Sequence, residues 1–369
     1  MKKIAGVLSL FVLWISAASG QRAVENPAKP ESPRAGRVVQ LKEVSRIADK
    51  AGKFFFRETW DIKAGDDGSL FVLEPNKLYE FDAAGTFIRN LFRKGEGPGE
   101  FNAGITDFFL GNGEIVVFSS NVRKIVRLNR DGTLIADVRP LGFSAFGLLG
   151  VHEGRSFVLS REPGKYERKT GIFEDVLTIR VIDAQGREEA PGNIPMVFPF
   201  SISYHVEGKR SGSTYISRLL TAADPARPRF VYFYHTPEYS VKRLDLEKPG
   251  DVIEIKRPYD RVRMELSREV PYPTPKYHND ICRLLVHGDR LWVVTSTIDK
   301  TKGILVDVFD MDGRYEDAFY LPLRGILAKD RVTYYALLAL GGTFLHAVEV
   351  DNEGTLSIVK YAVVDPLLK

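Results

Sequence analysis

The stretches Ser69–Glu74 (SLFVLE) and Leu78–Gly85 (LYEFDAAG) form a pattern that returns at Glu114–Phe118 (EIVVF) and Lys124–Gly132 (KIVRLNRDG). Each copy has a short apolar strand, a turn, a second apolar strand ending in Asp or Asn, and a turn ending in Gly. The closing glycines are 47 residues apart, about the length of one four-stranded blade of a β-propeller. Looser copies bring the pattern to six. The sequence therefore predicts an all-β fold, a six-bladed β-propeller.

The turns have a conformational reason for their composition. Hairpins with the right twist need residues at positive φ, which Gly, Asn and Asp tolerate best. The strands between them are dense in Val, Ile, Phe, Tyr and Leu, as half-buried strands require. Four further turns of this kind are expected, at Ala184–Gly186, Lys248–Gly250, Met311–Gly313 and Asp351–Gly354.

Strand counting predicts how the ring closes. The sixth blade lacks an outer strand, because the chain stops soon after its third strand at Thr355–Val364. The segment Val38–Val44 precedes the first blade, which spans about 54–94, and has no partner of its own. We expect it to supply the missing strand and remove an exposed edge. The alternative is a free arm.

Two connections are too long for simple turns. Arg187–Pro228 is expected to include an inner strand near Tyr215–Thr221, and the second connection is Arg257–Asp280. Long irregular segments in a compact fold are usually functional or mobile.

The N-terminal residues predict export to the periplasm or the outside of the cell. Residues 1–20 resemble a signal peptide, with Lys2 and Lys3, the apolar run Ile4–Ile15, and small residues before Gln21. No membrane span is expected once this segment is removed. Residues 21–36 are rich in Pro, Ala and charge and predict a flexible leader, and residues 37–369 form the predicted propeller domain.

Charge and cysteine content exclude two classes of function. The formal charge is +4, and it falls to +2 without Lys2 and Lys3, which is too mild to indicate nucleic-acid binding. The single cysteine, Cys282, cannot form an intrachain disulfide, and cysteine-based zinc sites are excluded. Its apolar neighbours predict a buried core residue rather than a nucleophile.

The loop Arg93–Phe101 (RKGEGPGEF) links the first predicted blade to the second. With the strands around it, over about 65–140, it resembles the NHL-repeat propellers and the bacterial exported six-bladed propellers of TolB-like architecture that carry a GxGPGEF loop. The loop is not a phosphate-binding motif, because it carries two carboxylates and precedes a strand. Its glycines let the backbone turn sharply between blades, and Phe101 is expected to hold it against the core.

Polar residues of the inner strands line the central channel of a propeller. Asp61, Asp107 and Asp280 are candidates for a metal site. The resemblance implies this arrangement, because six-bladed lactonases and related hydrolases place carboxylates and Asn around one metal there. Oxygen ligands suit Ca²⁺ or Mg²⁺. The alternative is that these are hydrogen-bonded polar residues in a wet channel.

Two basic, aromatic stretches in the long connections are candidates for a binding surface, since Arg and Tyr are over-represented at such surfaces. An acidic ligand would fit them, and the alternative is a solvated loop without a partner. The candidate ligand-binding residues are Tyr204, Lys209, Arg210, Arg257, Arg261 and Arg263.

Three functions remain open at this point. The first is a non-catalytic module that binds a small molecule, or an envelope or extracellular protein. The second is a metal-dependent hydrolase or lyase with its site at the central channel. The third is a purely structural role within an envelope assembly. The sequence assigns no catalytic residue, because the scattered histidines and serines form no recognisable motif.

Overall fold

The structure is a computed structural model of the chain. It describes residues 22–48, 54–111, 113–139, 142–167, 172–189, 194–204, 212–215, 219–224, 228–235, 237–264, 276–323, 327–329 and 334–365.

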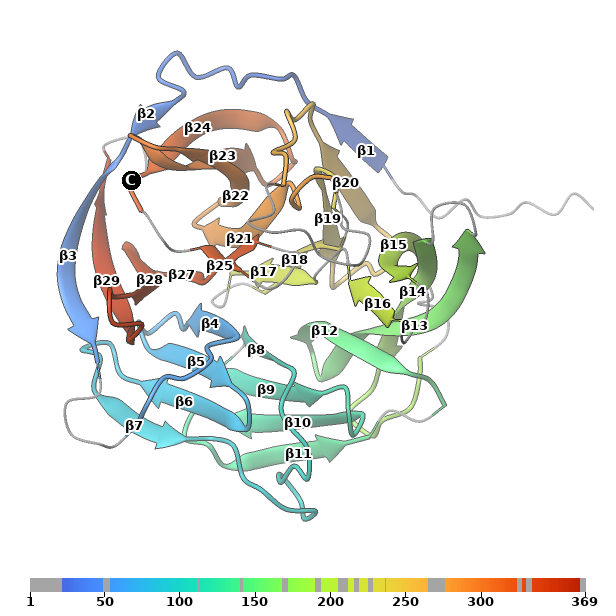
Figure 1. Cartoon of the computed structure of the whole chain (residues 1–369). Helices are drawn as coiled ribbons and strands as arrows, with labels where there is room; N and C mark the ends of the chain where they lie inside the picture. The colour runs from blue at the N-terminus through green and yellow to red at the C-terminus, as the bar shows by residue number, and fades with distance from the viewer. Residues whose placement is uncertain are drawn as a thin grey trace, which may run out of the picture.

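The described strands form a ring of six blades, each an antiparallel meander that starts at the central axis (Figure 1). Blades 1 and 2 have four strands each, and blade 3 has five. Blade 1 contains β4 (Asp61–Ala64), β5 (Leu70–Glu74), β6 (Lys77–Phe81) and β7 (Phe87–Asn90). Blade 2 contains β8 (Asp107–Gly111), β9 (Glu114–Ser119), β10 (Lys124–Asn129) and β11 (Leu134–Val138). Blade 3 contains β12 (Ala145–His152), β13 (Arg155–Glu167), β14 (Ile172–Ile182), β15 (Ile194–Tyr204) and β16 (Gly212–Tyr215).

The other three blades each receive a strand from the N-terminal segment. Blade 4 contains β17 (Leu220–Ala223), β18 (Phe230–Tyr234), β19 (Ser240–Asp245) and β20 (Val252–Lys256), with β1 (Arg22–Glu25) outside them. Blade 5 contains β21 (Ile281–His287), β22 (Arg290–Asp299), β23 (Gly303–Asp310) and β24 (Tyr315–Leu321), with β2 (Arg37–Val38) outside them. A small hairpin of β25 (Leu327–Lys329) and β26 (Tyr334–Ala336) precedes blade 6, which contains β27 (Leu338–Gly341), β28 (Phe344–Val350), β29 (Leu356–Val364) and β3 (Gln40–Ile47).

The predicted fold and ring closure are confirmed. β3 pairs antiparallel with β29 as the outer strand of blade 6, in a register that runs from Ile47–Ile358 to Gln40–Val364. Buried side chains then pack between blade 6 and blade 1, with Ile47 and Ile358 against Ile62 and Phe81. Among the described residues, no helix is long and apolar enough to cross a membrane.

The repeated Asp–Gly turn explains why the blades share one geometry. In four blades, Oδ1 of an Asp at the end of the third strand or directly after it, or directly after the second strand in blade 6, accepts the backbone N–H groups of the residues two and four positions later. The Gly three positions after that Asp has φ of 84–85° in these blades, a conformation that costs other residues a steric clash. The four aspartates are Asp82, Asp183, Asp310 and Asp351.

The GxGPGEF loop is held by a buried lysine from the next blade. Nζ of Lys124 donates to the carbonyls of Gly97 (3.1 Å) and Glu100 (2.6 Å). It also pairs with Asp137 at 2.7 Å. Phe101 is buried beneath this lysine, whose Nζ lies 5.5 Å from the ring centre. The loop is therefore a structural link between blades 1 and 2, as the sequence predicts.

The first long connection differs from the prediction. Most of the described residues of Arg187–Pro228 lie in strands, because β15 and β16 lengthen blade 3 outward. The inner strand of blade 4 is β17, which begins at Leu220, near the end of the predicted range.

The N-terminal segment also differs from the predicted flexible leader over residues 21–36. β1 pairs in parallel with β20, and β2 pairs in parallel with β24. Residues 22–47 thus follow the rim past blades 4, 5 and 6 in turn (Figure 1). The physical reason is that the outer strands of blades 4 and 5 present unpaired backbone groups, which an extended segment satisfies. We call residues 22–39 the strap.

Arg37 ties the strap to two blades. Its Nη1 lies 2.8 Å from Oδ2 of Asp317 in blade 5, and its Nε lies 2.7 Å from Oδ2 of Asp365, just after blade 6. The side chain of Asp365 is 5% exposed. The guanidinium of Arg37 and the two carboxylates compensate one another's charge. Removing the guanidinium would leave two negative charges with little access to water.

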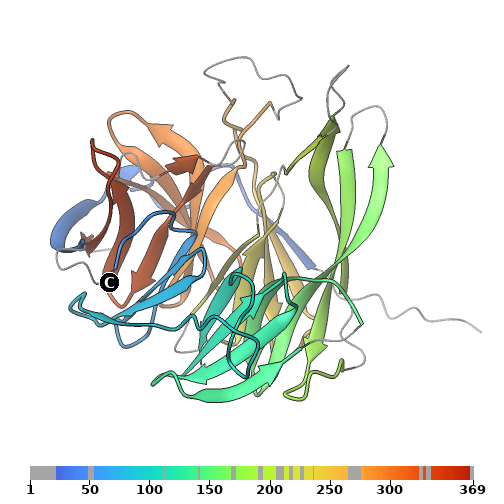
Figure 2. The ribbon, with the colours of Figure 1, turned by 60° about the horizontal axis from the view of Figure 1, so that its bottom comes forward.

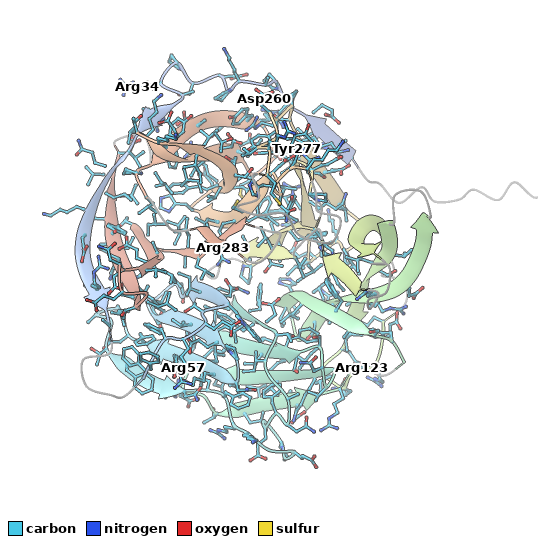
Figure 3. All side chains as sticks on the ribbon, viewed as in Figure 1. Arg34, Arg57, Arg123, Asp260, Tyr277 and Arg283 are labelled. Atoms are coloured by element: carbon cyan, nitrogen blue, oxygen red, sulfur yellow. The ribbon has the colours of Figure 1, made fainter. Side chains whose placement is uncertain are left out.

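We expect Arg37→Met to lower the free energy of unfolding by about 3 kcal/mol, because both carboxylates lose their partner. Urea denaturation at pH 7 measures this. Arg34→Met is the matched control, since Arg34 is exposed on the outer rim (Figure 3) and its removal should cost less than about 0.5 kcal/mol. Equal effects of the two substitutions would contradict the role given to Arg37.

Candidate functional site

The inner strands β4, β8, β12, β17 and β21 all begin at the same face of the ring. A cavity of about 230 Å³ lies there, at the mouth of the central channel. We call it the mouth cavity. Its lining includes Trp60, Asp61, Thr106, Asp107, Phe146 and Arg283.

Blade 3 rises beyond the mouth. Ala145, the first residue of β12, pairs with Ser160 of β13, so Arg161–Glu167 of β13 continues past the start of the inner strand. Figure 2 shows β13 and β14 as a tall green hairpin beside the ring. The long hairpin of blade 3 therefore extends beyond the face of the ring on which the mouth cavity opens.

Two aromatic side chains give the mouth cavity an apolar part. Trp60 precedes β4, and its Nε1 donates to Oε1 of Glu58 at 3.1 Å. Phe146 belongs to β12 and stacks on His235 with ring centres 5.2 Å apart. Aromatic surface beside a few fixed polar groups is typical of small-molecule sites.

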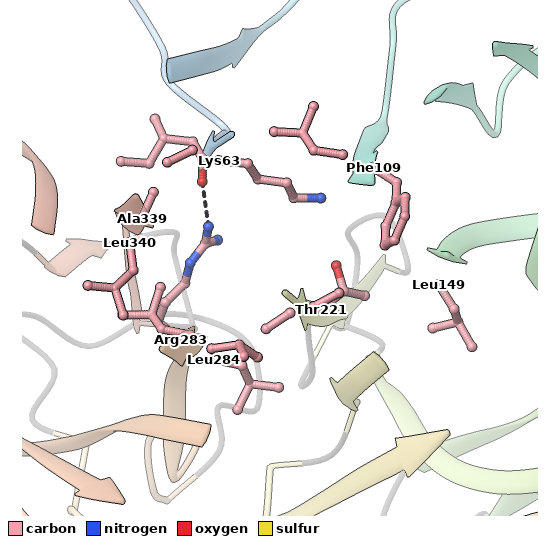
Figure 4. Close-up of a pocket in the computed structure, with 15 residues that line it drawn as sticks. Lys63, Phe109, Leu149, Thr221, Arg283, Leu284, Ala339 and Leu340 are labelled. Carbon is pink, nitrogen blue, oxygen red and sulfur yellow. Dashed lines mark hydrogen bonds between the residues drawn. The ribbon is translucent and has the colours of Figure 1, made fainter. Parts of the chain in front are cut away.

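Four charged side chains form a belt across the channel at the floor of the mouth cavity. Nζ of Lys63 lies 3.0 Å from Oδ1 of Asp107 and 3.5 Å from Oδ2 of Asp61. Arg283 reaches over from blade 5, placing Nη1 2.5 Å from Oδ1 of Asp61, and Nη2 donates to the carbonyl of Ile62 at 2.6 Å. Arg283 lies near the ring axis in Figure 3, and its bond to Ile62 is the dashed line in Figure 4. We call these four residues the belt.

The belt contains two positive and two negative groups, so its formal charge is zero. Burial is the largest cause that acts on Asp107 and raises the pKa of its carboxyl, while the nearby Lys63 ammonium opposes that rise. The Lys63 ammonium also lies 4.6 Å from the centre of the Phe108 ring, a favourable cation–π contact.

A second, smaller chamber of about 70 Å³ lies beyond the belt along the channel. Alanine and leucine side chains dominate its lining, including Ala64, Ala222, Leu284, Ala339 and Leu340 (Figure 4). The channel is therefore polar and aromatic at the mouth, charged at the belt and mostly apolar below it.

The three predicted metal ligands do not converge. Asp61 and Asp107 meet at Lys63, whereas Asp280 pairs with Arg261 at 3.0 Å. In the part of the chain that the structure describes, no group of three or more His, Cys, Asp or Glu side chains could hold a metal ion. Asp61 and Asp107 instead have ammonium and guanidinium partners, which supply the positive charge that a metal ion would bring.

Arg257 differs most from its predicted role on a binding surface. Its side chain is 6% exposed and lies 2.5 Å from Oδ2 of the fully buried Asp307. Tyr239 and Tyr315 each donate to Asp307 at 2.6 Å and lie under the guanidinium plane. Burial raises the pKa of both phenols, which therefore stay protonated donors. Arg257 thus links blade 4 to blade 5, and a ligand cannot reach it.

Arg261 and Arg263 lie on the second long connection, over blades 4 and 5, where Figure 3 labels Asp260 and Tyr277. Arg261 packs its guanidinium 4.9 Å from the ring centre of Tyr277 and donates to the carbonyl of Pro237 at 3.1 Å. Arg263 is exposed, and its backbone bridges to Tyr277. Of the other candidates, Tyr204 ends β15, and Lys209 and Arg210 lie outside the described residues.

Sequence reasoning missed Lys63, Phe146 and Arg283. A signal for Lys63 existed, because residues two apart in a strand share a face, which puts Lys63 on the side of Asp61. Arg283 was visible as a lone charge in an apolar inner strand. Nothing in the sequence connects Arg283 to Asp61, 222 residues away.

Comparisons with known proteins support the fold. A family described as "6-bladed beta-propeller" matches residues 53–145, which span blades 1 and 2 and the loop between them. No curated protein sequence matches the chain at a significant level.

Two solved structures show the same fold over most of the chain. One is a candidate exported protein of Bacteroides fragilis, with a TM-score of 0.53 and 13% identity, covering 93% of this chain and 100% of its own. The other is a member of the DUF4221 family from Bacteroides vulgatus, with a TM-score of 0.53 and 11% identity, covering 89% of this chain and 99% of its own. At such identities the likeness concerns the fold alone.

The buried Asp280 leads to a pH prediction. Burial, opposed by Arg261 and assisted by Glu238, raises the pKa of the Asp280 carboxyl to about 6, above about 3.9 in an unfolded chain. Its contribution to stability is therefore fully present below about pH 4 and is lost as the pH rises through 6. We expect the free energy of unfolding of the wild type, relative to Asp280→Asn, to fall by on the order of 2–3 kcal/mol between pH 4 and pH 7.

Urea denaturation of both proteins at pH 4, 5, 6 and 7 measures this difference. Asp289→Asn is the control, because the Asp289 side chain is 77% exposed and its substitution should change the free energy of unfolding by less than about 0.5 kcal/mol. Parallel profiles for the wild type and Asp280→Asn would contradict the assignment.

Proposed function

We propose that this protein is an exported, non-catalytic binding module whose ligand site is the mouth cavity. The belt is the observation that carries this proposal. Because its charges are paired with one another, the cavity floor is polar, neutral and held in place before any ligand arrives. A preorganised site of this kind favours binding, since little ordering is left to be done when the ligand enters.

The lining indicates the class of ligand. Trp60 and Phe146 offer flat apolar surfaces, while Thr106, Asp61, Asp107 and Arg283 offer hydrogen-bonding groups at the floor. A volume of about 230 Å³ is below the range of about 300–1,000 Å³ that holds drug-sized ligands. These features fit a small polar molecule of zero net charge.

Export rests on the signal-like residues 1–20 and agrees with the candidate exported protein that shares the fold. Within this proposal the chain acts in the periplasm or outside the cell, and the resemblance to NHL-repeat and TolB-like propellers is part of it. Partners of the exposed Arg263 and Tyr277 would be small acidic molecules or envelope proteins.

A metal-dependent hydrolase or lyase is the second candidate. Asp107 favours it, because a buried carboxyl with a raised pKa in a cavity is a common property of acid–base catalysts. For a metal ion to bind at Asp61 and Asp107, Lys63 and Arg283 would have to move away. Elemental analysis of the purified chain, with its Tm measured with and without EDTA, separates the two candidates, because a metal bound only to the folded state raises Tm.

Trp60→Ala tests the site. A library of small neutral polar molecules, screened by thermal shift, should contain compounds that raise the Tm of the wild type. At 100 times Kd such a compound stabilises the fold by about 2.7 kcal/mol. We expect Trp60→Ala and Phe146→Ala each to reduce its affinity at least tenfold, because each removes an apolar wall.

Phe55→Ala is the matched control, since Phe55 belongs to the same segment as Trp60 and is 54% exposed. It should leave the affinity unchanged. A compound whose binding survives both cavity substitutions would place the ligand site elsewhere.

A further inference from the structure

The groove between blades 4 and 5 is filled by the strap. Val24 of β1 pairs with Ile255 of β20, and the next strap residues lead into the groove. There, Nδ2 of Asn26 donates to the carbonyls of Gly313 (2.9 Å) and Lys256 (3.1 Å). Oδ1 of Asn26 accepts the backbone N–H of Tyr315 at 2.8 Å. The carboxamide of Asn26 thus satisfies backbone hydrogen-bonding groups at the end of β20 in blade 4 and in the turn before β24 in blade 5.

The groove between blades 1 and 2 has the same construction. In blade 5, the turn glycine Gly313 lies against Ile255 of blade 4. In blade 2, the turn glycine Gly132 lies against Leu91, which comes just after β7 of blade 1. Their φ values are 84° and 82°. Leu134 begins β11 as Tyr315 begins β24. Gly132 and Leu134 therefore correspond to the two residues of blade 5 that contact Asn26.

In the described part of the chain, this second groove has no strap. β7 is the last strand of its sheet, whereas β20 carries β1 outside it. A cavity of about 60 Å³ lies in the groove, and its lining includes Leu91, Arg93, Gly99, Leu128, Gly132 and Leu134. Since one water occupies about 30 Å³ in the liquid, this is room for a small polar side chain. We call this site the 1/2 groove.

The walls of the 1/2 groove are fixed and partly apolar. The N–H of Gly99 donates to Oδ2 of Asp137 at 2.8 Å, and Lys124 holds the loop before it. Ile88 of β7 is 48% exposed and Leu134 is 42% exposed. An unpaired strand edge beside exposed apolar side chains favours the addition of another strand.

The 1/2 groove is lined by two basic side chains, Arg89 and Arg93, and one carboxylate, Asp131. Arg93, its neighbour Lys94 and Asp131 are exposed. Arg89 pairs with Glu80 at 2.7 Å and donates to the carbonyl of Asp131. The strap segment that fills the equivalent groove reads Val24-Glu25-Asn26. An apolar residue, an acidic residue and a carboxamide in succession would suit both the walls and the charge of the 1/2 groove.

We propose that the 1/2 groove binds an extended, acidic segment of a partner protein, added in parallel to β7. Its apolar residue covers Ile88 and Leu91, and its Asn enters the cavity, where it bonds with the backbone around Gly132 and Leu134. The interaction is β-strand addition, in which backbone hydrogen bonds supply affinity and the side-chain pocket supplies specificity. The mouth cavity takes no part in it, so this proposal does not depend on the proposed function.

The test uses the strap sequence as a probe. A fluorescein-labelled peptide of residues 23–28 (AVENPA), which carries the single acidic side chain of Glu25, is titrated with the full chain, and its anisotropy is measured. It does not displace the strap between blades 4 and 5, because the tethered segment is present at an effective concentration on the order of millimolar. We expect saturable binding that weakens at least tenfold for the peptide with Ala in place of Asn.

Leu134→Glu locates the site. It should weaken peptide binding at least tenfold, whereas Val350→Glu, at a position that is 54% exposed on blade 6, should leave binding unchanged. Ile88→Glu is a second variant on a different strand, and unchanged Tm values confirm that each variant is folded. Absence of saturable binding to the wild type, or binding that neither groove variant weakens, would overturn the proposal.

Discussion

The pairing of β3 with β29 is the constraint on which the rest of the structure depends. It joins residues near the two ends of the described chain into one blade and leaves neither blade 6 nor blade 1 without a neighbour. Five groups of buried side chains then pack adjacent blades against each other in a complete circuit around the axis. The strap extends the same principle outward, because each of its strands lies on the outer edge of a different blade. In this way β1, β2 and β3 cover the outer edges of blades 4, 5 and 6, and exposed strand edges are sites where other chains can pair and aggregate.

Closure also creates the candidate site. Residues far apart in the chain reach the axis only because the inner strands are held in a ring, and Arg283 meets Asp61 across that axis. The belt has no net charge, because its two acidic side chains pair with its two basic ones. The belt also separates the aromatic mouth of the channel from the apolar chamber below. The mouth cavity is therefore a consequence of the ring rather than of any local motif. That explains why propellers with similar blades can differ in function.

The sequence predicted the structural features that depend on residues close to one another in the chain. The Asp–Gly turns were visible because the positive φ of Gly85 and its equivalents is a requirement of the turn itself, and ring closure followed from a strand without a partner. The strap was not visible, because Asn26 is bonded to Gly313 and its neighbours, far along the chain. Arg257 looked like a surface residue for the same reason, since its partner Asp307 lies 50 residues later. The carboxylates Asp61 and Asp107 line the mouth cavity, but their pairing with Lys63 depends on how blades 1 and 2 lie side by side and could not be predicted from the sequence.

Native-state hydrogen exchange of β3 and β29 tests the closed ring most directly. Amides whose opening requires global unfolding exchange with the full free energy of unfolding, whereas those at fraying edges exchange with a far smaller one. The account predicts that the paired amides of β3 and β29 exchange as slowly as those of the central strands β5 and β9. Exchange of β3 at the rate of a free terminal arm, with β29 behaving as an exposed edge, would contradict it.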